Sequence, residues 1–211
     1  MSIRRILFAL TLLLSCVSLQ AAPPVEGTDY RTLEPVQHTD TPDKIVVIEF
    51  FSYGCPHCYE FYPMISAWAA KLPKDVVLER VATGMGRIAW TNLAKAYYAL
   101  GATGDVSRLD GQLFHAIHEE HQPLFDEKAI GSWVAAHGVD AGKFNTAFDS
   151  FGVNTKLTQA EQLAENYKID GVPSLGIDGK YVVIGKTFEE LLSNADALIA
   201  KVRSERATAH K

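Results

Sequence analysis

The stretch Phe50-Phe51-Ser52-Tyr53-Gly54-Cys55-Pro56-His57-Cys58 places two cysteines, three residues apart, just after an apolar run. The run, Ile45 to Phe51, predicts a strand buried on both faces, and the segment from Cys55 to about Leu72 has the pattern of an amphipathic helix. Pro56 suits the first helical turn, where its missing N–H would have had no partner. We therefore expect Cys55 at the helix N-terminus and Cys58 one turn later on the same face.

The first residues of the chain indicate an export signal. The basic pair Arg4-Arg5 precedes the apolar run Ile6 to Leu14, which is about half the ~20 residues that a membrane span needs. We expect residues 1–22 to be the signal peptide, removed near Ala21 or Ala22, and the mature protein to be periplasmic. The remaining chain has an ordinary globular composition, with 47% hydrophobic and 21% charged residues.

Removal of the signal would leave the chain with two of its three cysteines. Cys16 would leave with the signal peptide, so Cys55 and Cys58 would remain. A lipoprotein signal at Cys16 is an alternative, although the bulky Leu14 fits that pattern poorly. The loss of two basic residues takes the formal net charge from −5 to −7, which argues against nucleic acid as a partner. Because no cysteine is left for structural disulfides, we expect the pair to take part in a reaction and not to stabilise the fold.

The rest of the chain is predicted to run β-α-β, then a helical stretch, then α-β-β-α. A short edge strand could precede this order between Thr28 and Leu33. Asp178-Gly179 is a strong hairpin signal, and Thr187 with Glu190 forms a capping box before the last helix. The further predicted elements are strand Val76–Ala82, helices Asn92–Leu100, Val106–Glu119, Glu127–His137, Asp140–Phe148 and Thr155–Tyr167, strands Ser174–Ile177 and Lys180–Ile184, and a last helix to about Arg206.

Without its helical middle, this order is that of a thioredoxin core, so the predicted fold class is α/β, a thioredoxin fold with an inserted all-helical domain. Residues 23–83 and 155–211 would form the thioredoxin-like domain, and residues 84–154 the helical insertion. Together with these features, Cys55-Pro56-His57-Cys58, the preceding Glu49-Phe50-Phe51 and the late Gly171-Val172-Pro173 resemble the DsbA family of thiol:disulfide oxidoreductases.

The resemblance implies a reversible disulfide in which Cys55 is the nucleophile and Cys58 the resolving thiol. A helix dipole stabilises a thiolate by only about 0.3–2 kcal/mol, so N–H contacts to sulfur and the ring of His57 are expected to add to it. Pro56 completes the motif. The alternative for the cysteines is a zinc half-site, which needs two more ligands, and we expect neither a metal nor a cofactor.

Glu49 interrupts the apolar strand, and Val172-Pro173 lies before the predicted hairpin; each is a further candidate site residue. A carboxylate such as that of Glu49, buried in a central strand, should have a raised pKa. It could exchange a proton with Cys58 through water, a role that the family's glutamate supports; the alternative is an acid at the strand edge. The resemblance implies a cis peptide bond before Pro173, beside which an extended substrate could pair with Val172.

His115, His118 and His121 repeat every third residue, but this spacing drifts around a helix and does not converge well on a metal. Neighbouring acidic residues favour a solvated face instead. Trp68, Trp90 and Trp133 are most simply explained as core residues.

The predicted function is a thiol:disulfide interchange protein, an oxidase that introduces disulfide bonds into exported proteins. Its expected partners are unfolded exported proteins with free cysteines, and the resemblance implies a DsbB-like quinone-linked membrane protein for reoxidation. We expect a monomer. One alternative is a disulfide reductase or isomerase of the same fold, and another is a non-redox binding module.

Overall fold

The computed structural model describes residues 23–209, so the predicted signal peptide and Cys16 lie outside the described residues. Within this range the chain forms five strands and seven helices. The strands are β1 (Tyr30–Thr32), β2 (Ile45–Phe51), β3 (Val76–Ala82), β4 (Ser174–Ile177) and β5 (Tyr181–Val183). The helices are α1 (Pro56–Ala69), α2 (Ile88–Thr103), α3 (Val106–His118), α4 (Glu127–Ala136), α5 (Ala141–Phe148), α6 (Phe151–Asn166) and α7 (Phe188–Ala209).

The strands form one sheet in the order β1-β5-β4-β2-β3, with β2 and β3 parallel and the other pairs antiparallel. All seven residues of β2 are buried, as its unbroken apolar run predicted. Full burial of each large apolar side chain contributes about 1.5–3 kcal/mol. The β4–β5 turn places Asp178 and Gly179 at φ angles of 55° and 68°, as a two-residue hairpin requires.

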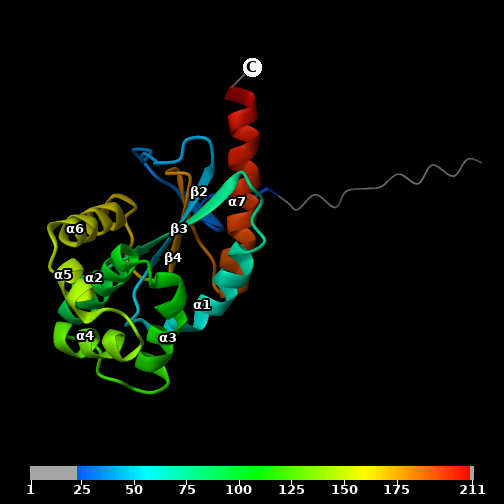
Figure 1. The fold of residues 1–211 in the computed structure, drawn as a ribbon. Coiled ribbons are helices and arrows are strands. Elements are labelled where there is room, and N and C mark those ends of the chain that lie inside the picture. Colours follow the sequence, from blue (N-terminus) through cyan, green and yellow to red (C-terminus); the bar gives the residue numbers. More distant parts are fainter. Residues whose placement is uncertain (1–22, 210–211) are drawn as a thin grey trace, which may run out of the picture.

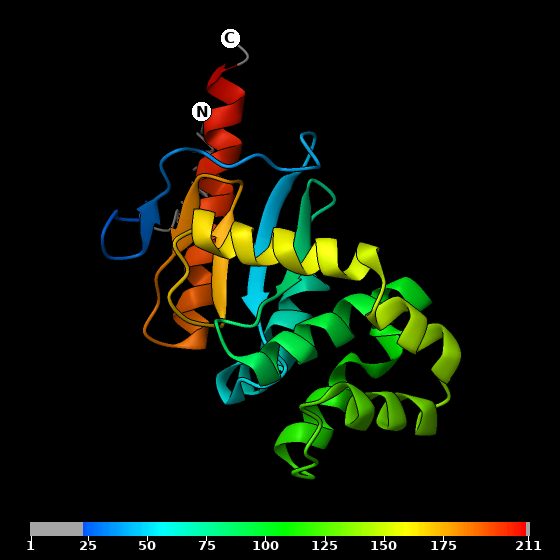
Figure 2. The ribbon, with the colours of Figure 1, turned by 90° about the vertical axis from the view of Figure 1, so that its left-hand side faces the viewer.

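Helices cover both faces of the sheet (Figure 1). On one face, α1 and α7 pack over a core that includes Val47, Phe61 and Leu198. On the other, α6 crosses the strands, as Figure 2 shows, over Val46 and Phe50 among others. The structure therefore confirms the predicted thioredoxin fold with a helical insertion.

The insertion follows β3 and places α2 to α5 beyond the end of the strands (Figure 2). Its core cluster includes Leu93, Leu113 and Phe144, and it extends to Cys55 and Cys58. The cysteine pair thus lies where the two parts of the molecule meet. The predicted boundary after residue 154 falls inside α6, and we propose that the insertion ends between α5 and α6.

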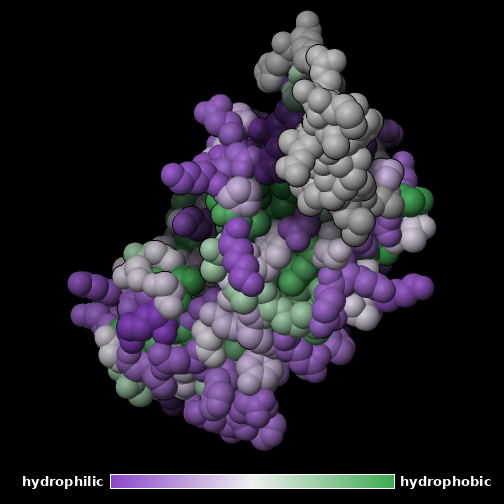
Figure 3. All heavy atoms as spheres, turned by 90° about the vertical axis from the view of Figure 1, so that its right-hand side faces the viewer, coloured by the Kyte–Doolittle hydropathy of each residue, from purple (hydrophilic) through white to green (hydrophobic). Residues whose placement is uncertain are grey.

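In the described part of the chain, no helix is long and apolar enough to span a membrane. The hydropathy of one face is shown in Figure 3, where hydrophobic side chains gather toward the middle and hydrophilic ones surround them.

Candidate active site

Cys55 is the N-cap residue of α1, between the end of β2 and the first helical turn. The turn from Ser52 to Gly54 is closed by hydrogen bonds that the backbone N–H groups of Cys55 and Gly54 donate to the carbonyl and hydroxyl oxygens of Ser52 (3.1 and 3.3 Å). Pro56 follows as the first residue of the helix, as predicted. The Cys55 side chain is therefore held at the end of α1 where backbone N–H groups are free.

Both cysteines are free thiols in this structure, and they differ in exposure. Cys55 is 5% exposed and Cys58 is fully buried. The hydrogen bond from the Cys58 thiol is the largest factor that lowers the pKa of Cys55, to about 6; the backbone N–H groups of Cys58 and His57 and the charge of the His57 ring lower it further, against desolvation. Burial is the largest factor that raises the pKa of Cys58, and the neighbouring Cys55 sulfur raises it further.

His57 points into solvent, with a side chain that is 73% exposed. Its Nδ1 lies 3.3 Å from a carboxylate oxygen of Glu60, one turn further along α1. The ring charge is the smallest of the favourable contributions to the Cys55 thiolate. His57 thus adds to the thiolate stabilisation, whereas Cys58 provides the main part.

This ranking gives a first testable prediction. Replacement of His57 by alanine should raise the pKa of Cys55, and replacement of Cys58 by alanine should raise it more, because the thiol hydrogen bond is the larger contribution. Ultraviolet absorbance of the thiolate, followed against pH in the reduced proteins, measures both changes. A larger rise for the His57 variant would contradict the ranking.

Val172, which precedes Pro173, lies directly against Cys55. The peptide bond between Val172 and Pro173 is cis, as predicted, and the Val172 carbonyl oxygen accepts a hydrogen bond from the Cys55 thiol at 3.3 Å. This hydrogen bond needs the thiol proton, so it is lost when Cys55 ionises, and the Val172 carbonyl oxygen is then open to another donor. Pairing of a substrate strand with Val172 remains a prediction.

Glu49 is fully buried in β2, the second strand from one edge of the sheet, so the alternative of an acid escaping at a strand edge is wrong. Burial raises its pKa, and the guanidinium of Arg80 opposes this. Arg80 lies opposite Glu49 in the β2–β3 register, and its Nε donates to Glu49 Oε2 at 2.5 Å. The other carboxylate oxygen of Glu49, Oε1, has no hydrogen-bond partner in the structure.

Arg80 connects this carboxylate to the helical insertion. Its Nη1 donates to Asp110 of α3, and Asp110 also accepts a hydrogen bond of 2.5 Å from the Tyr53 hydroxyl. Desolvation and the Asp110 charge raise the pKa of Tyr53 well above its usual value, so the hydroxyl keeps its proton and donates. Arg80 also lies over the ring of Phe51 at 3.9 Å. Sequence analysis missed Arg80, Tyr53 and Asp110 as site residues.

The three histidines do not share one environment. His115 is on the exposed side of α3 and pairs with Glu120 at 3.2 Å, as the predicted solvated face requires. For His118 that prediction is wrong, because its Nε2 lies 2.7 Å from the Tyr53 carbonyl oxygen and its ring stacks on Tyr59. Among residues 23–209, no three His, Cys, Asp or Glu side chains group as they would around a metal ion.

Two clefts lie near the candidate site residues. One, of about 460 Å³, adjoins the cysteine motif and is lined by His57, Val172, Pro173, Phe188 and Leu191 among others.

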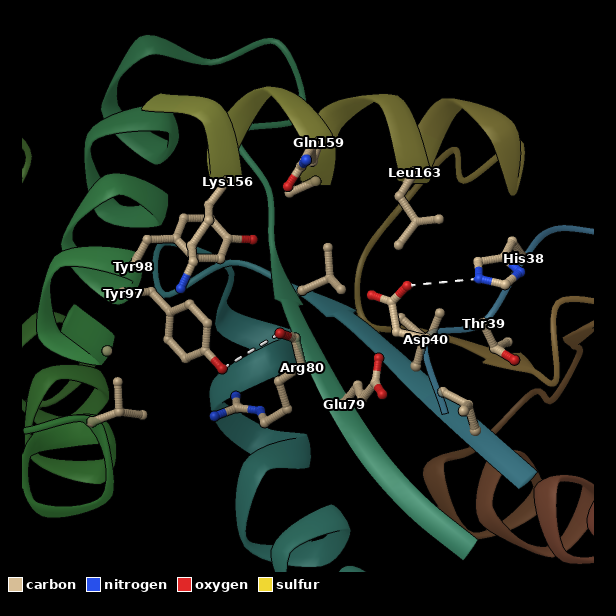
Figure 4. Close-up of a pocket in the computed structure, with 16 residues that line it drawn as sticks. His38, Thr39, Asp40, Glu79, Arg80, Tyr97, Tyr98, Lys156, Gln159 and Leu163 are labelled. Carbon is tan, nitrogen blue, oxygen red and sulfur yellow. Dashed lines mark hydrogen bonds and ion pairs between the residues drawn. The ribbon is translucent and has the colours of Figure 1, made fainter. Parts of the chain in front are cut away.

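A second cleft, of about 640 Å³, lies between the sheet and α6 (Figure 4). Its lining includes Arg80, whose carbonyl oxygen accepts from the Tyr97 hydroxyl at 3.4 Å, but neither Cys55 nor Cys58. Of the two clefts, the first is therefore the one that adjoins the cysteine motif.

A low-pKa thiol at a helix N-terminus, a buried second thiol and a cis-proline loop in a thioredoxin fold define a thiol:disulfide oxidoreductase. Comparison with known proteins specifies the family. The model of the DSBA-like thioredoxin domain matches residues 64–195. The chain is 39% identical over 203 residues to the thiol:disulfide interchange protein DsbA of Bordetella parapertussis, with 94% of this chain and 96% of that protein covered. The chain belongs to the DsbA family.

Solved structures agree with this assignment. The crystal structure of Pseudomonas aeruginosa DsbA superimposes with a TM-score of 0.81 at 36% identity, covering 88% of this chain and 96% of that one. The structure of the oxidoreductase DsbA from Xylella fastidiosa has a TM-score of 0.82 at 30% identity, with 87% and 100% covered. The similarity therefore extends over the insertion as well as the thioredoxin core.

Proposed function

We propose that the protein oxidises pairs of thiols in exported proteins through a reversible disulfide between Cys55 and Cys58. The observation that carries this proposal is the asymmetry of the two thiols: the pKa of Cys55 is lowered to about 6, whereas Cys58 is fully buried and its pKa is raised. A stabilised Cys55 thiolate favours the reduced form of the protein, which makes its disulfide a good oxidant.

The reaction begins with the disulfide form. A client thiolate attacks the Cys55 sulfur, the Cys55–Cys58 bond breaks, and Cys58 leaves with the electron pair and takes up a proton. A second client thiolate then attacks the client sulfur of the mixed disulfide and releases Cys55 as a thiolate. The client loses two electrons and the protein gains them.

Glu49 is a candidate source of the proton for Cys58. The pKa of Glu49 is raised by burial, and its charge is one of the factors that raise the pKa of Cys58. A protonated Glu49 would donate to the leaving Cys58 through water and would recover a proton when the pair is reoxidised. We assign Glu49 this role and Pro56 that of starting α1 directly after the nucleophile.

The cleft beside the motif suits an unfolded client. Phe188 and Leu191 give it an apolar wall, and Val172 and Pro173 lie at its cysteine end. An extended client segment would place apolar side chains in this cleft and its backbone along Val172. Binding of this kind depends more on an extended conformation of the client than on its amino-acid sequence, so many different clients would fit.

Reoxidation and location complete the proposal. We propose that a quinone-linked membrane protein of the DsbB type reoxidises Cys58 and Cys55, that residues 1–22 direct export to the periplasm, and that the mature protein acts there as a monomer. The amino-terminal charge and apolar pattern support export, and the membership in the DsbA family supports the oxidising direction.

Trapping of the intermediate tests the function. Oxidised protein mixed with a reduced, unfolded client should oxidise the client stoichiometrically. In a Cys58→Ser variant, the Cys55 thiolate should attack a client whose cysteine is already in a disulfide. The resulting mixed disulfide between Cys55 and the client should persist, because no resolving thiol remains. Non-reducing electrophoresis and mass spectrometry show both products.

The alternatives predict other results. The pair of a reductase would remain oxidised in glutathione buffers that reduce the pair of an oxidase, and its dithiol form would reduce client disulfides while it becomes oxidised. A non-redox binding module would bind clients equally well with Cys55 blocked. Either result would overturn the proposal.

A further inference from the structure

Helix α3 of the insertion holds Tyr53, two residues before the nucleophile, at two points. The Tyr53 hydroxyl donates to Asp110 Oδ1 at 2.5 Å, and the Tyr53 carbonyl oxygen lies 2.7 Å from His118 Nε2. Asp110 and His118 are eight residues apart, so they project from one side of α3. One helix thus fixes both the side chain and the backbone of the active-site turn.

The second contact has a defined donor. A carbonyl oxygen only accepts hydrogen bonds, so the proton must be on Nε2 of His118. The same ring stacks on Tyr59, with centroids 5.1 Å apart and planes 14° apart. Tyr59 directly follows Cys58, so His118 touches the chain on both sides of the cysteine motif.

The first contact is closed to solvent. Tyr53 is 1% exposed and Asp110 is 6% exposed. The second oxygen of Asp110 accepts from Arg80, which fixes the carboxylate while Tyr53 donates to it. With this burial, water has little access to replace either hydrogen bond, and the position of the turn depends on α3.

We propose that Asp110 and His118 are positioning residues for disulfide exchange. By holding Tyr53, they place the Cys55 sulfur where it meets the Cys58 thiol and the backbone N–H groups of His57 and Cys58. The inference rests on the proposed exchange reaction at Cys55. It assigns to the helical insertion a part in setting the reactivity of the cysteine pair, besides any part in binding clients.

The two redox states depend on this placement to different degrees. In the disulfide, a covalent bond fixes the Cys55 sulfur against Cys58. In the dithiol, the Cys55 thiolate depends on several weak contacts that must be aligned together. A looser turn therefore destabilises the reduced state more than the oxidised one, which raises the thiolate pKa and weakens the protein as an oxidant.

Variants of His118 test the proposal. His118→Phe keeps a ring over Tyr59 and removes the donor, whereas His118→Gln restores an N–H donor at a similar position. The matched control is His115→Phe, one turn earlier on the exposed side of α3. For each protein we would measure the equilibrium with glutathione and the pKa of the Cys55 thiolate.

We expect His118→Phe to shift the glutathione equilibrium about five- to tenfold toward the oxidised protein, the effect of one hydrogen bond, and to raise the Cys55 pKa. His118→Gln should recover most of both changes, and His115→Phe should show neither. Tyr53→Phe, which removes the link to Asp110, should shift both quantities in the same direction as His118→Phe and carries the test if that variant fails to fold.

Denaturation of both redox forms distinguishes positioning from support of the fold. If α3 only supported the fold, the variants would lose equal stability in the reduced and oxidised states while the equilibrium constant and the thiolate pKa stayed unchanged, and that result would overturn the inference. Failure of the unmodified protein to exchange disulfides would instead overturn the proposed function, so the two failures are distinct.

Discussion

A rise in pH from 6 to 8.5 is expected to make the reduced protein progressively more stable relative to the oxidised one. The pKa of Cys55 is lowered from 9.0 to about 6 in the folded protein, chiefly by the Cys58 thiol. A group with a lowered folded pKa adds stability that is complete above its unfolded pKa and is lost as the pH falls through the folded one. The oxidised protein has no such thiol, so only the reduced form gains.

The magnitudes decide which form is the more stable. A difference of about three pKa units is worth about 4 kcal/mol when complete, but only about 1.4 kcal/mol at pH 7, where the unfolded thiol is still protonated. Against this, the chain-entropy contribution of a disulfide that closes so short a loop is about 2 kcal/mol. The reduced form should therefore become the more stable one above about pH 7.5, by about 1 kcal/mol at pH 8.5.

Urea unfolding of both forms at pH 6, 7 and 8.5 measures this difference. Above pH 9 the trend should end, because the raised pKa of Cys58 keeps it protonated in the folded protein while it ionises in the unfolded chain. A Cys55→Ala variant is the control and should show no gain over this range. A stability difference that is constant with pH, or that favours the reduced form more in acid, would contradict the lowered pKa of Cys55.

The parts of the fold that depend on local sequence could be predicted. β2 is a continuous apolar run and α1 begins at a proline, so both were placed from neighbouring residues alone. α2 and α6 begin four residues before their predicted starts at Asn92 and Thr155, since their first residues, Ile88 and Phe151, are exposed apolar residues that break the helical pattern. The signal for α6 was present in Ser150, whose hydroxyl caps the backbone N–H of Val153.

The site divides in the same way. The cysteines, His57 and Glu49 stand close together in the sequence, whereas Asp110 and His118 come from a helix whose orientation toward β2 depends on tertiary packing. Periodicity along α3 separates its buried face from its exposed face but does not say what that face meets. Arg80 could have been found, because a parallel β2–β3 pair of equal lengths places it opposite Glu49.

Replacement of Arg80 by methionine is expected to destabilise the protein by about 3–5 kcal/mol, the usual cost of breaking a buried ion pair. The guanidinium donates to Glu49 and to Asp110, and its side chain is only 14% exposed. Methionine retains much of the volume but none of the charge. Two carboxylates would then remain in the interior without a cation.

The matched control is Arg203→Met. Arg203 pairs with Asp75 at 2.8 Å, but both side chains are about half exposed, so water replaces the lost contact. We expect a loss of less than about 1 kcal/mol there. Urea unfolding of the reduced proteins at pH 7 compares the two variants. Equal losses of unfolding free energy would mean that the buried Glu49–Arg80–Asp110 network stabilises the fold no more than an exposed ion pair does.

The pH dependence of the Arg80→Met deficit identifies its cause. Without the guanidinium, which opposes the effect of burial, the pKa of Glu49 should rise further above its usual range. An acid with a raised folded pKa loses stability as the pH rises and recovers it when protonated, so the deficit should narrow as the pH falls below 7. Adding Glu49→Gln to Arg80→Met should remove the charge at all pH values and restore part of the stability at pH 7. A deficit that is independent of pH and unchanged by Glu49→Gln would show that lost packing against Phe51, and not the unpaired carboxylate, causes the destabilisation.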